Sequence, residues 1–91
     1  MARIFLTHHV RDYDEWRQAY DADAERRADA GIGESGHFHS AEDRNRFLIV
    51  WDTEMTVEDA SAMASGMLSD PELGKLMAEA GVLEKPEFWV A

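Results

Sequence analysis

The sequence predicts a single α+β domain in which helices pack on one face of a four-stranded sheet. Three observations lead to this prediction: strand-like and helical segments alternate, one central strand is apolar on both faces, and cysteine is absent. A chain of 91 residues suffices for one compact unit, so residues 1–91 are expected to form one domain. Without cysteine, the fold depends neither on disulfide bonds nor on a cysteine-ligated metal.

The first strand is expected at residues 3–10, which are rich in β-branched and apolar side chains. Because side chains alternate across a strand, His8 shares a face with Ile4 and Leu6, and His9 points to the opposite face. An imidazole that is half-buried in this way can accept or donate a proton near neutral pH, which makes His8 the catalytic candidate. The structural alternative is a histidine paired with a neighbouring hydroxyl or carbonyl.

An amphipathic helix is expected over residues 13–30. Asp12, followed three residues later by Glu15, has the spacing of a capping box, and Gly31 is typical of a helix end. The residues that recur at helical spacing and are expected to face the sheet are Trp16, Tyr20, Ala24 and Arg27 or Ala28. The polar residues between them are expected to face solvent: Asp21, Asp23, Glu25 and Arg26.

A hairpin follows, with strands at residues 36–40 and 46–52 and a turn at 41–45. Residues 47–51 are all apolar, which is typical of a strand buried on both faces. Helices cover only one face of the predicted sheet, and no further element is expected for the other. A second copy of the chain is the simplest cover, so the sequence predicts a homodimer.

Two more helical segments and a last strand complete the pattern. Thr56 with Asp59 predicts one helix start, and Asp70-Pro71 predicts a break with a new start. Gly81 is expected to end the second segment, and residues 86–90 form the last strand, with its proline at the beginning. The apolar stripes of the two segments are Val57, Ala60, Met63, Ala64, Met67 and Leu68, then Leu73, Leu76, Met77 and Ala80.

The resulting order, strand-helix-strand-strand-helix-strand, is that of the ferredoxin-like βαββαβ fold. This topology implies the sheet order 4-1-3-2 with antiparallel neighbours. Both helical regions then lie on one face of the sheet, and the opposite face carries no element of the same chain.

The charge of the chain excludes several classes of partner. Nine basic residues stand against nineteen acidic ones, and the formal net charge is −10. Binding to nucleic acid or to an anionic membrane needs clustered lysine and arginine, so neither is expected. The longest apolar run, residues 47–51, falls far short of the roughly 20 residues of a membrane span, and no signal peptide is recognisable. A cytoplasmic protein is expected.

His37 and His39 form a possible metal-binding pair. Two residues apart on a strand, their side chains point to one face, roughly 6.5–7 Å apart along the strand. This spacing permits a shared Zn²⁺ or Ni²⁺. His8 lies two strands away, about 9–10 Å sideways, so an acid or a second chain would have to complete the site. The structural alternative is a polar pair on an edge strand, where charge discourages edge-to-edge pairing.

Aromatic and sulfur-containing side chains suggest a pocket for a flat ligand, with packing in the core as the alternative. The candidate substrate-binding residues are Trp16, Tyr20, Trp51, Met63 and Met67. Arg27 lies on the apolar stripe of the first helix, where it either binds a substrate carboxylate or phenolate or extends its charged end past the helix into solvent.

Short motifs are spread along nearly the whole chain: His8-x-Val10-x-Asp12-Tyr13-x-x-Trp16, Phe38-x-Ser40-Ala41-Glu42-Asp43-x-Asn45, Trp51-Asp52, and Ala80-Gly81-Val82 before Pro86. Together they resemble a group of small bacterial dimeric α+β-barrel proteins described as cyclase-like or antibiotic-biosynthesis-monooxygenase-like. The resemblance implies a small-molecule pocket between sheet and helices in each subunit. Such pockets serve cofactor-free oxygenation of polyphenolic polyketides, ring closure or isomerisation, or, in some branches, haem binding. His8 and Trp16 are the site residues that the resemblance implies first.

Two classes of function therefore remain open. The first is a cofactor-free cyclase, isomerase or monooxygenase that acts on an aromatic or polyketide-like molecule, with His8 accepting a proton and the pocket aromatics holding the substrate. No cofactor is expected in this case. The second is a non-enzymatic homodimer that binds a ligand, or a metal through His37 and His39.

Overall fold

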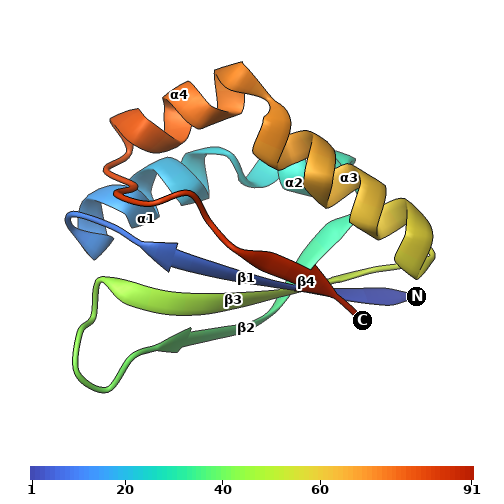
Figure 1. Cartoon of the computed structure of the whole chain (residues 1–91), viewed down its shortest axis with the longest axis horizontal. Coiled ribbons are helices and arrows are strands. Elements are labelled where there is room, and N and C mark those ends of the chain that lie inside the picture. Colours follow the sequence, from blue (N-terminus) through green and yellow to red (C-terminus); the bar gives the residue numbers. More distant parts are fainter.

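The computed structural model describes all of residues 1–91 and has the predicted architecture (Figure 1). The sheet consists of β1 (Ala2–His9), β2 (Ile32–His39), β3 (Arg46–Thr53) and β4 (Phe88–Val90). Its order, β2-β3-β1-β4, and its antiparallel pairings confirm the predicted topology. The helices are α1 (Tyr13–Ala22), α2 (Ala24–Asp29), α3 (Val57–Ser69) and α4 (Pro71–Glu79), and all four lie on the same side of the sheet. No helix is long and apolar enough to cross a membrane.

The single helix predicted over residues 13–30 is wrong, because the chain forms two helices with Asp23 between them. The backbone of Asp23 leaves the helical conformation (φ −97°, ψ 9°), and its N–H donates to the carbonyl of Tyr20 at 3.2 Å, an i to i−3 bond. Asp23 then forms an ion pair with Arg26. This break turns two side chains that were predicted to face solvent toward the space between helices and sheet.

The predicted capping box at the start of α1 is also wrong. Asp12 makes no side-chain capping bond, and Glu15 pairs instead with Arg11. The backbone N–H of Tyr13 finds its acceptor outside the helix, in the side-chain oxygen of Asn45 at 2.9 Å. Asn45, the residue before β3, therefore caps α1 in place of Asp12 and Glu15.

The other element signals are largely confirmed. Thr56 accepts the N–H of Asp59 at 3.1 Å at the start of α3, and Asp70 accepts the N–H of Glu72 at 3.0 Å at the start of α4. Gly81, at φ 92°, follows the end of α4. Strand β2 begins four residues earlier than predicted, because its register shifts at a bulge around Ser35 and lets the strand continue. Val57 is 45% exposed and lies outside the buried stripe of α3, which consists of alanines one turn apart.

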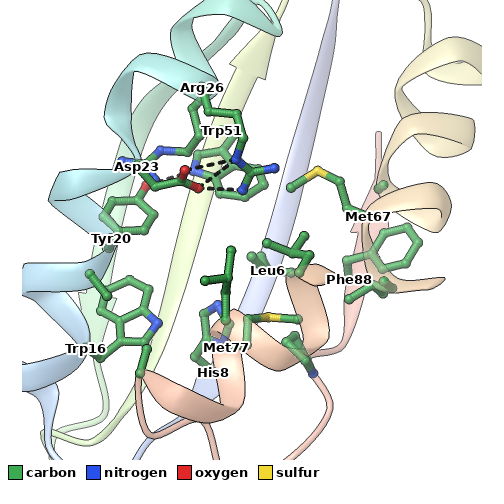
Figure 2. A pocket seen from close by; sticks show the side chains of 18 of the residues that line it. Leu6, His8, Trp16, Tyr20, Asp23, Arg26, Trp51, Met67, Met77 and Phe88 are labelled. Carbon is green, nitrogen blue, oxygen red and sulfur yellow. Dashed lines mark hydrogen bonds and ion pairs between the residues drawn. The ribbon is translucent and has the colours of Figure 1, made fainter. Parts of the chain in front are cut away.

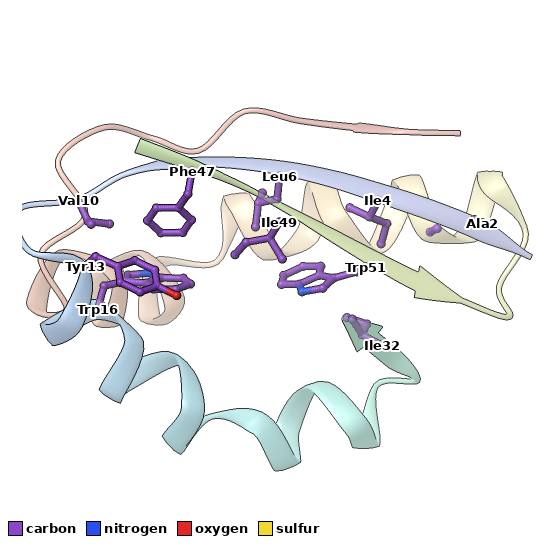
Figure 3. Packing of buried hydrophobic residues seen from close by; sticks show 11 residues of the cluster. Ala2, Ile4, Leu6, Val10, Tyr13, Trp16, Ile32, Phe47, Ile49 and Trp51 are labelled. Atoms are coloured by element: carbon purple, nitrogen blue, oxygen red, sulfur yellow. The ribbon is translucent and has the colours of Figure 1, made fainter. Parts of the chain in front are cut away.

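The core lies between the inner face of the sheet and the helices (Figure 3). Ile4 and Leu6 of β1 lie beside Ile49 and Trp51 of β3, and Trp16 of α1 belongs to the same cluster and packs on Phe47. His8 pairs in register with Phe47 and therefore points to this same inner face, as predicted. The imidazole is thus placed among apolar side chains.

The outer face of the sheet carries exposed apolar side chains and has no helix over it. Phe5 of β1 stacks on Trp89 of β4 at 5.4 Å between ring centroids. Phe38 of β2 is 60% exposed and Trp89 is 51% exposed, although both are large hydrophobic residues. Phe38 pairs with Leu48, which lies on the outer face of β3. The structure therefore accounts for the doubly apolar sequence of β3, and the predicted second copy stays a prediction.

Candidate functional site

A cavity of about 370 Å³ lies between the inner face of the sheet and the helices (Figure 2). Its volume lies in the range of small-molecule binding sites. Strand β1 contributes Ile4, Leu6 and His8 to its wall, and α4 contributes Leu73, Leu76 and Met77. Apolar side chains make up most of the wall, so the cavity suits a mainly apolar molecule.

Most of the predicted site residues meet in this cavity. Those that line it are His8, Trp16, Tyr20, Arg27, Trp51 and Met67. Met63 instead packs against the core without reaching the cavity. His37 and His39 also lie outside it, because they are on β2, beyond the rings of Tyr13 and Phe47. The structure therefore separates the proposed substrate residues from the proposed metal pair.

Several lining residues were missed by the sequence reasoning. Asp23 and Arg26 were expected to face solvent, and they reach the cavity because the helix breaks at Asp23. No glycine or proline marks this break, so the sequence gives no local signal for it. Met77 and Phe88 could have been found, since both lie on apolar faces that were predicted to meet the sheet or the helices.

His8 is a buried imidazole with an unpaired nitrogen. The residue is 8% exposed, and its Nδ1 is buried without a hydrogen-bond partner. Its ring centroid lies 5.3 Å from that of Trp16 and 5.6 Å from that of Phe47. Burial, and secondarily the charge of His37, lower the pKa of His8 to about 4, so the ring is neutral at pH 7. His8 can accept a proton, and the surrounding structure already leaves a nitrogen without a partner.

The lowered pKa of His8 predicts how stability depends on pH. An unfolded histidine binds a proton below pH 6.5, and folded His8 binds one only near pH 4. The unfolded state therefore holds more protons between these values, and acidification from pH 6.5 to 4 should cost about 3 kcal/mol through His8. Denaturant unfolding at several pH values checks this, and the difference between the wild type and His8→Leu isolates the residue. If the free energy of unfolding changed with pH in the same way in both proteins, the lowered pKa of His8 would be contradicted.

Tyr20 is held at the cavity wall by three contacts. Its hydroxyl accepts the indole N–H of Trp51 at 2.9 Å and donates to Glu34 at 3.1 Å. Its ring stacks on Trp16 at 4.6 Å between centroids. Burial raises the pKa of Tyr20, so the hydroxyl keeps its proton at neutral pH. Tyr20 and Trp51 therefore form a fixed polar edge in a mainly apolar wall.

A hydrogen-bonded chain continues from Glu34 to the surface. Glu34 accepts from Nδ1 of His37 at 3.0 Å, and Nε2 of His37 accepts the hydroxyl proton of Tyr13 at 3.0 Å. Arg17 donates to the same tyrosine oxygen at 3.3 Å. A carboxylate only accepts, which fixes the proton of His37 on Nδ1 in this arrangement. The chain connects the Tyr20 hydroxyl at the cavity to an arginine on α1.

The histidine pair is occupied by contacts within the chain. His37 uses both ring nitrogens in the hydrogen bonds above, and Nδ1 of His39 lies 2.8 Å from the carbonyl oxygen of Arg44. The chain has no group of three or more histidine, cysteine or acidic side chains arranged to hold a metal ion. A metal at His37 and His39 would require donors from a second chain and the loss of a hydrogen bond of His37.

Comparison with known proteins identifies the fold class. No protein-family profile and no curated protein matches the chain. Among solved structures, an antibiotic biosynthesis monooxygenase matches with a TM-score of 0.63 at 10% identity, over 100% of this chain and 96% of the other. An uncharacterised NIPSNAP domain protein from Burkholderia xenovorans matches with a TM-score of 0.64 at 14% identity, over 100% and 92%.

A proposed antibiotic biosynthesis monooxygenase from Nitrosomonas europaea is similar in the same way. Its TM-score is 0.62 at 16% identity, over 100% of this chain and 96% of the other. At such identities the shared feature is the fold. The chain therefore has the ferredoxin-like α+β fold found in antibiotic-biosynthesis-monooxygenase-like proteins.

Proposed function

We propose that the protein is a cofactor-free enzyme that acts on a small aromatic or polyketide-like molecule bound between sheet and helices. The observation that carries this proposal is the neutral imidazole of His8 in the wall of an apolar cavity, with its buried Nδ1 left without a hydrogen-bond partner. A buried polar atom without a partner destabilises a fold by about 1–3 kcal/mol. An apolar residue of similar size avoids that cost, so the imidazole is better explained by chemistry than by packing.

His8 acts as the proton acceptor in this proposal. Its neutral ring takes a proton from a phenol or from an activated carbon of the substrate, and the resulting anion stays next to the imidazolium. The apolar wall strengthens the attraction between the two charges, because water does not screen them. Proton removal of this kind initiates ring closure or isomerisation, and it prepares a phenol for reaction with oxygen.

The aromatic residues position the substrate. The ring of Trp16 lies against both His8 and Tyr20, with centroid distances of 5.3 and 4.6 Å. A flat molecule that packs on this surface has its edge near His8 and its far end near Tyr20 and Trp51. Met67 and Met77 line the cavity, and their flexible thioethers can adapt to the outline of the ligand.

A second copy of the chain covers the outer face of the sheet in this proposal. Phe5, Phe38 and Trp89 form an apolar surface there that no helix covers. Monomeric proteins seldom expose contiguous apolar patches of this kind. Pairing two sheets face to face would bury the same patch on both chains, as a two-fold dimer requires.

Tryptophan fluorescence tests binding in the cavity. Trp16 and Trp51 line it, whereas Trp89 lies on the opposite face of the sheet, so Trp89→Phe leaves the cavity reporters in place. Addition of a hydroxyanthraquinone is expected to quench the fluorescence of the wild type and of Trp89→Phe with the same saturation curve. Quenching that disappears in Trp89→Phe would place the ligand on the outer face and contradict the proposal.

A further inference from the structure

We propose that the cavity takes a substrate that carries a carboxylate at one end, and that Arg27 binds this carboxylate. This inference rests on the proposed function, because it names the substrate class for the same cavity. Arg27 lines the cavity, and three features of its surroundings support the assignment: its stacking, its lack of an acidic partner, and the balance of charge near it.

The guanidinium of Arg27 lies over an aromatic ring. Its central carbon lies 3.5 Å from the ring centroid of Tyr20, which is itself fixed by Trp51 and Glu34. Stacking uses the face of the guanidinium and leaves the N–H groups at its edge free to donate. Two parallel N–H groups in one plane match the two oxygens of a carboxylate. Arg27 is therefore oriented for such a contact before a ligand arrives.

Arg27 lacks an acidic partner in a chain that is rich in acids. Every other arginine forms an ion pair with an aspartate or glutamate: Arg3, Arg11, Arg17, Arg26, Arg44 and Arg46. Acidic residues outnumber basic ones by nineteen to nine, so an arginine could readily have been paired. Arg27 is also half-buried, which removes part of its hydration. An anion from outside the chain would supply the missing partner.

The charges near Arg27 favour an anion. Asp23 is the acidic residue in the cavity wall, and Arg26 neutralises it, with Nε at 2.9 Å from each carboxylate oxygen. Glu34 contacts Tyr20 and His37 and does not line the cavity. The charged residues of the wall therefore sum to one positive charge, contributed by Arg27.

The position of this cation sets the shape of the ligand. Trp51, which binds the Tyr20 hydroxyl, pairs in register with Ile4, four residues from His8 along β1. Four residues of strand span about 13 Å, so Trp51 and His8 lie at opposite ends of the cavity wall. Arg27 stacks on Tyr20, Tyr20 stacks on Trp16, and Trp16 contacts His8, so two aromatic rings separate the guanidinium from the imidazole. Figure 2 shows the Asp23–Arg26 pair and Trp51 at one end of the cavity, His8 at the other, and Tyr20 and Trp16 between them along one wall. The substrate is then an apolar body with a carboxylate at the end remote from the reacting atom.

Binding measurements with matched acid and ester pairs test the inference. The probes are anthraquinone-2-carboxylate with its methyl ester, and dodecanoate with its methyl ester, titrated by tryptophan fluorescence. One of the two acids will bind the wild type more tightly than the other. That acid is expected to bind at least tenfold more tightly than its own methyl ester, because only the acid gains a charge-assisted contact. Arg27→Gln should abolish the preference for the acid and leave the affinity for the ester within about twofold of the wild-type value. Arg27→Lys, which keeps the positive charge, should show part of the wild-type preference for the acid.

Arg17→Gln is the matched control. Arg17 also lies over the ring of Tyr20, at 5.6 Å, but it pairs with Asp21 and does not line the cavity. The acid preference should persist in this variant. A thermal melt of each variant checks that the fold is intact. Tighter binding of the aromatic acid than of dodecanoate identifies an aromatic body, and the reverse order identifies an alkyl acid.

Two results would overturn the assignment. Equal affinity of the wild type for acid and ester would show that no cation in the cavity recognises the carboxylate. An equal loss of acid and ester affinity in Arg27→Gln would show that Arg27 supports the ring of Tyr20 and nothing more. Failure of the proposed function looks different, because turnover would then be insensitive to replacement of His8 while the acid preference depended on Arg27.

Discussion

Replacing His8 by leucine is expected to remove turnover and to stabilise the folded chain. Loss of a positioned general base typically lowers a rate by about 10²–10⁴-fold. Leucine has a similar size and no polar atom, so it relieves the unpaired Nδ1 and should raise the free energy of unfolding by about 1–3 kcal/mol. Steady-state kinetics and urea unfolding of the same preparations measure the two effects.

The neighbouring histidine provides the control for this experiment. His9 points to the other face of β1, where its ring lies 3.1 Å from a carboxylate oxygen of Glu84. His9→Gln should therefore leave turnover near that of the wild type and should not stabilise the chain. If His8→Leu kept full turnover, or if it destabilised the fold, His8 would be a packing residue and the proposed chemistry would lose its base.

Placing a glutamate on the outer face of the sheet is expected to split the proposed dimer. Trp89 of the edge strand β4 is half-exposed and stacks on Phe5 on the uncovered face of the sheet. In a two-fold interface, Trp89→Glu places a carboxylate on both copies and removes two aromatic side chains. Light scattering should report about twice 10.3 kDa for the wild type and 10.3 kDa for the variant.

Two further variants separate this effect from unfolding. Phe38→Glu changes a different exposed residue of the same surface and should also give the single-chain mass. Ala62→Glu adds the same charge to an exposed position of α3 and should leave the dimer intact. A wild-type mass of one chain at micromolar concentration would rule out the dimer outright.

The fold could be predicted because its signals are local. The apolar run of β3 indicated a strand buried on both faces, and Thr56 and Asp70 marked helix starts through bonds to residues two or three positions away. Such signals need only the neighbouring sequence. Gly81 likewise ends α4 with a backbone angle that glycine adopts at low cost.

The errors concern the helical region of residues 13–30 and the cap at its start. Glu15 was expected to cap α1, but it pairs with Arg11, and Asn45 from before β3 caps the helix instead. The helix breaks at Asp23 although no glycine or proline, the usual helix-breaking residues, occurs there. These outcomes depend on which side chains meet in three dimensions, and spacing along the chain does not determine that.

Only part of the site was predicted, because some of its features depend on which side chains meet in three dimensions. His8 could be placed on the inner face from alternation alone, but its unpaired nitrogen depends on what surrounds it. A chain of hydrogen bonds from Tyr20 through Glu34 and His37 to Tyr13 joins β2 to α1. From the sequence, His37 was predicted only as a possible metal ligand. Arg26 pairs with Asp23, three positions before it, whereas Arg27 forms no ion pair with an acidic residue.

The protonation of His8 is the most direct test of the central claim that it is a buried base facing a substrate. Nitrogen NMR of the imidazole, followed from pH 7 to pH 3.5, should show a neutral ring in the free protein with a pKa near 4. Saturation with an acidic phenol should raise that pKa, because a bound phenolate stabilises the imidazolium. A pKa near 6.5 that does not change on addition of any phenol would contradict both the burial of His8 and its role as proton acceptor.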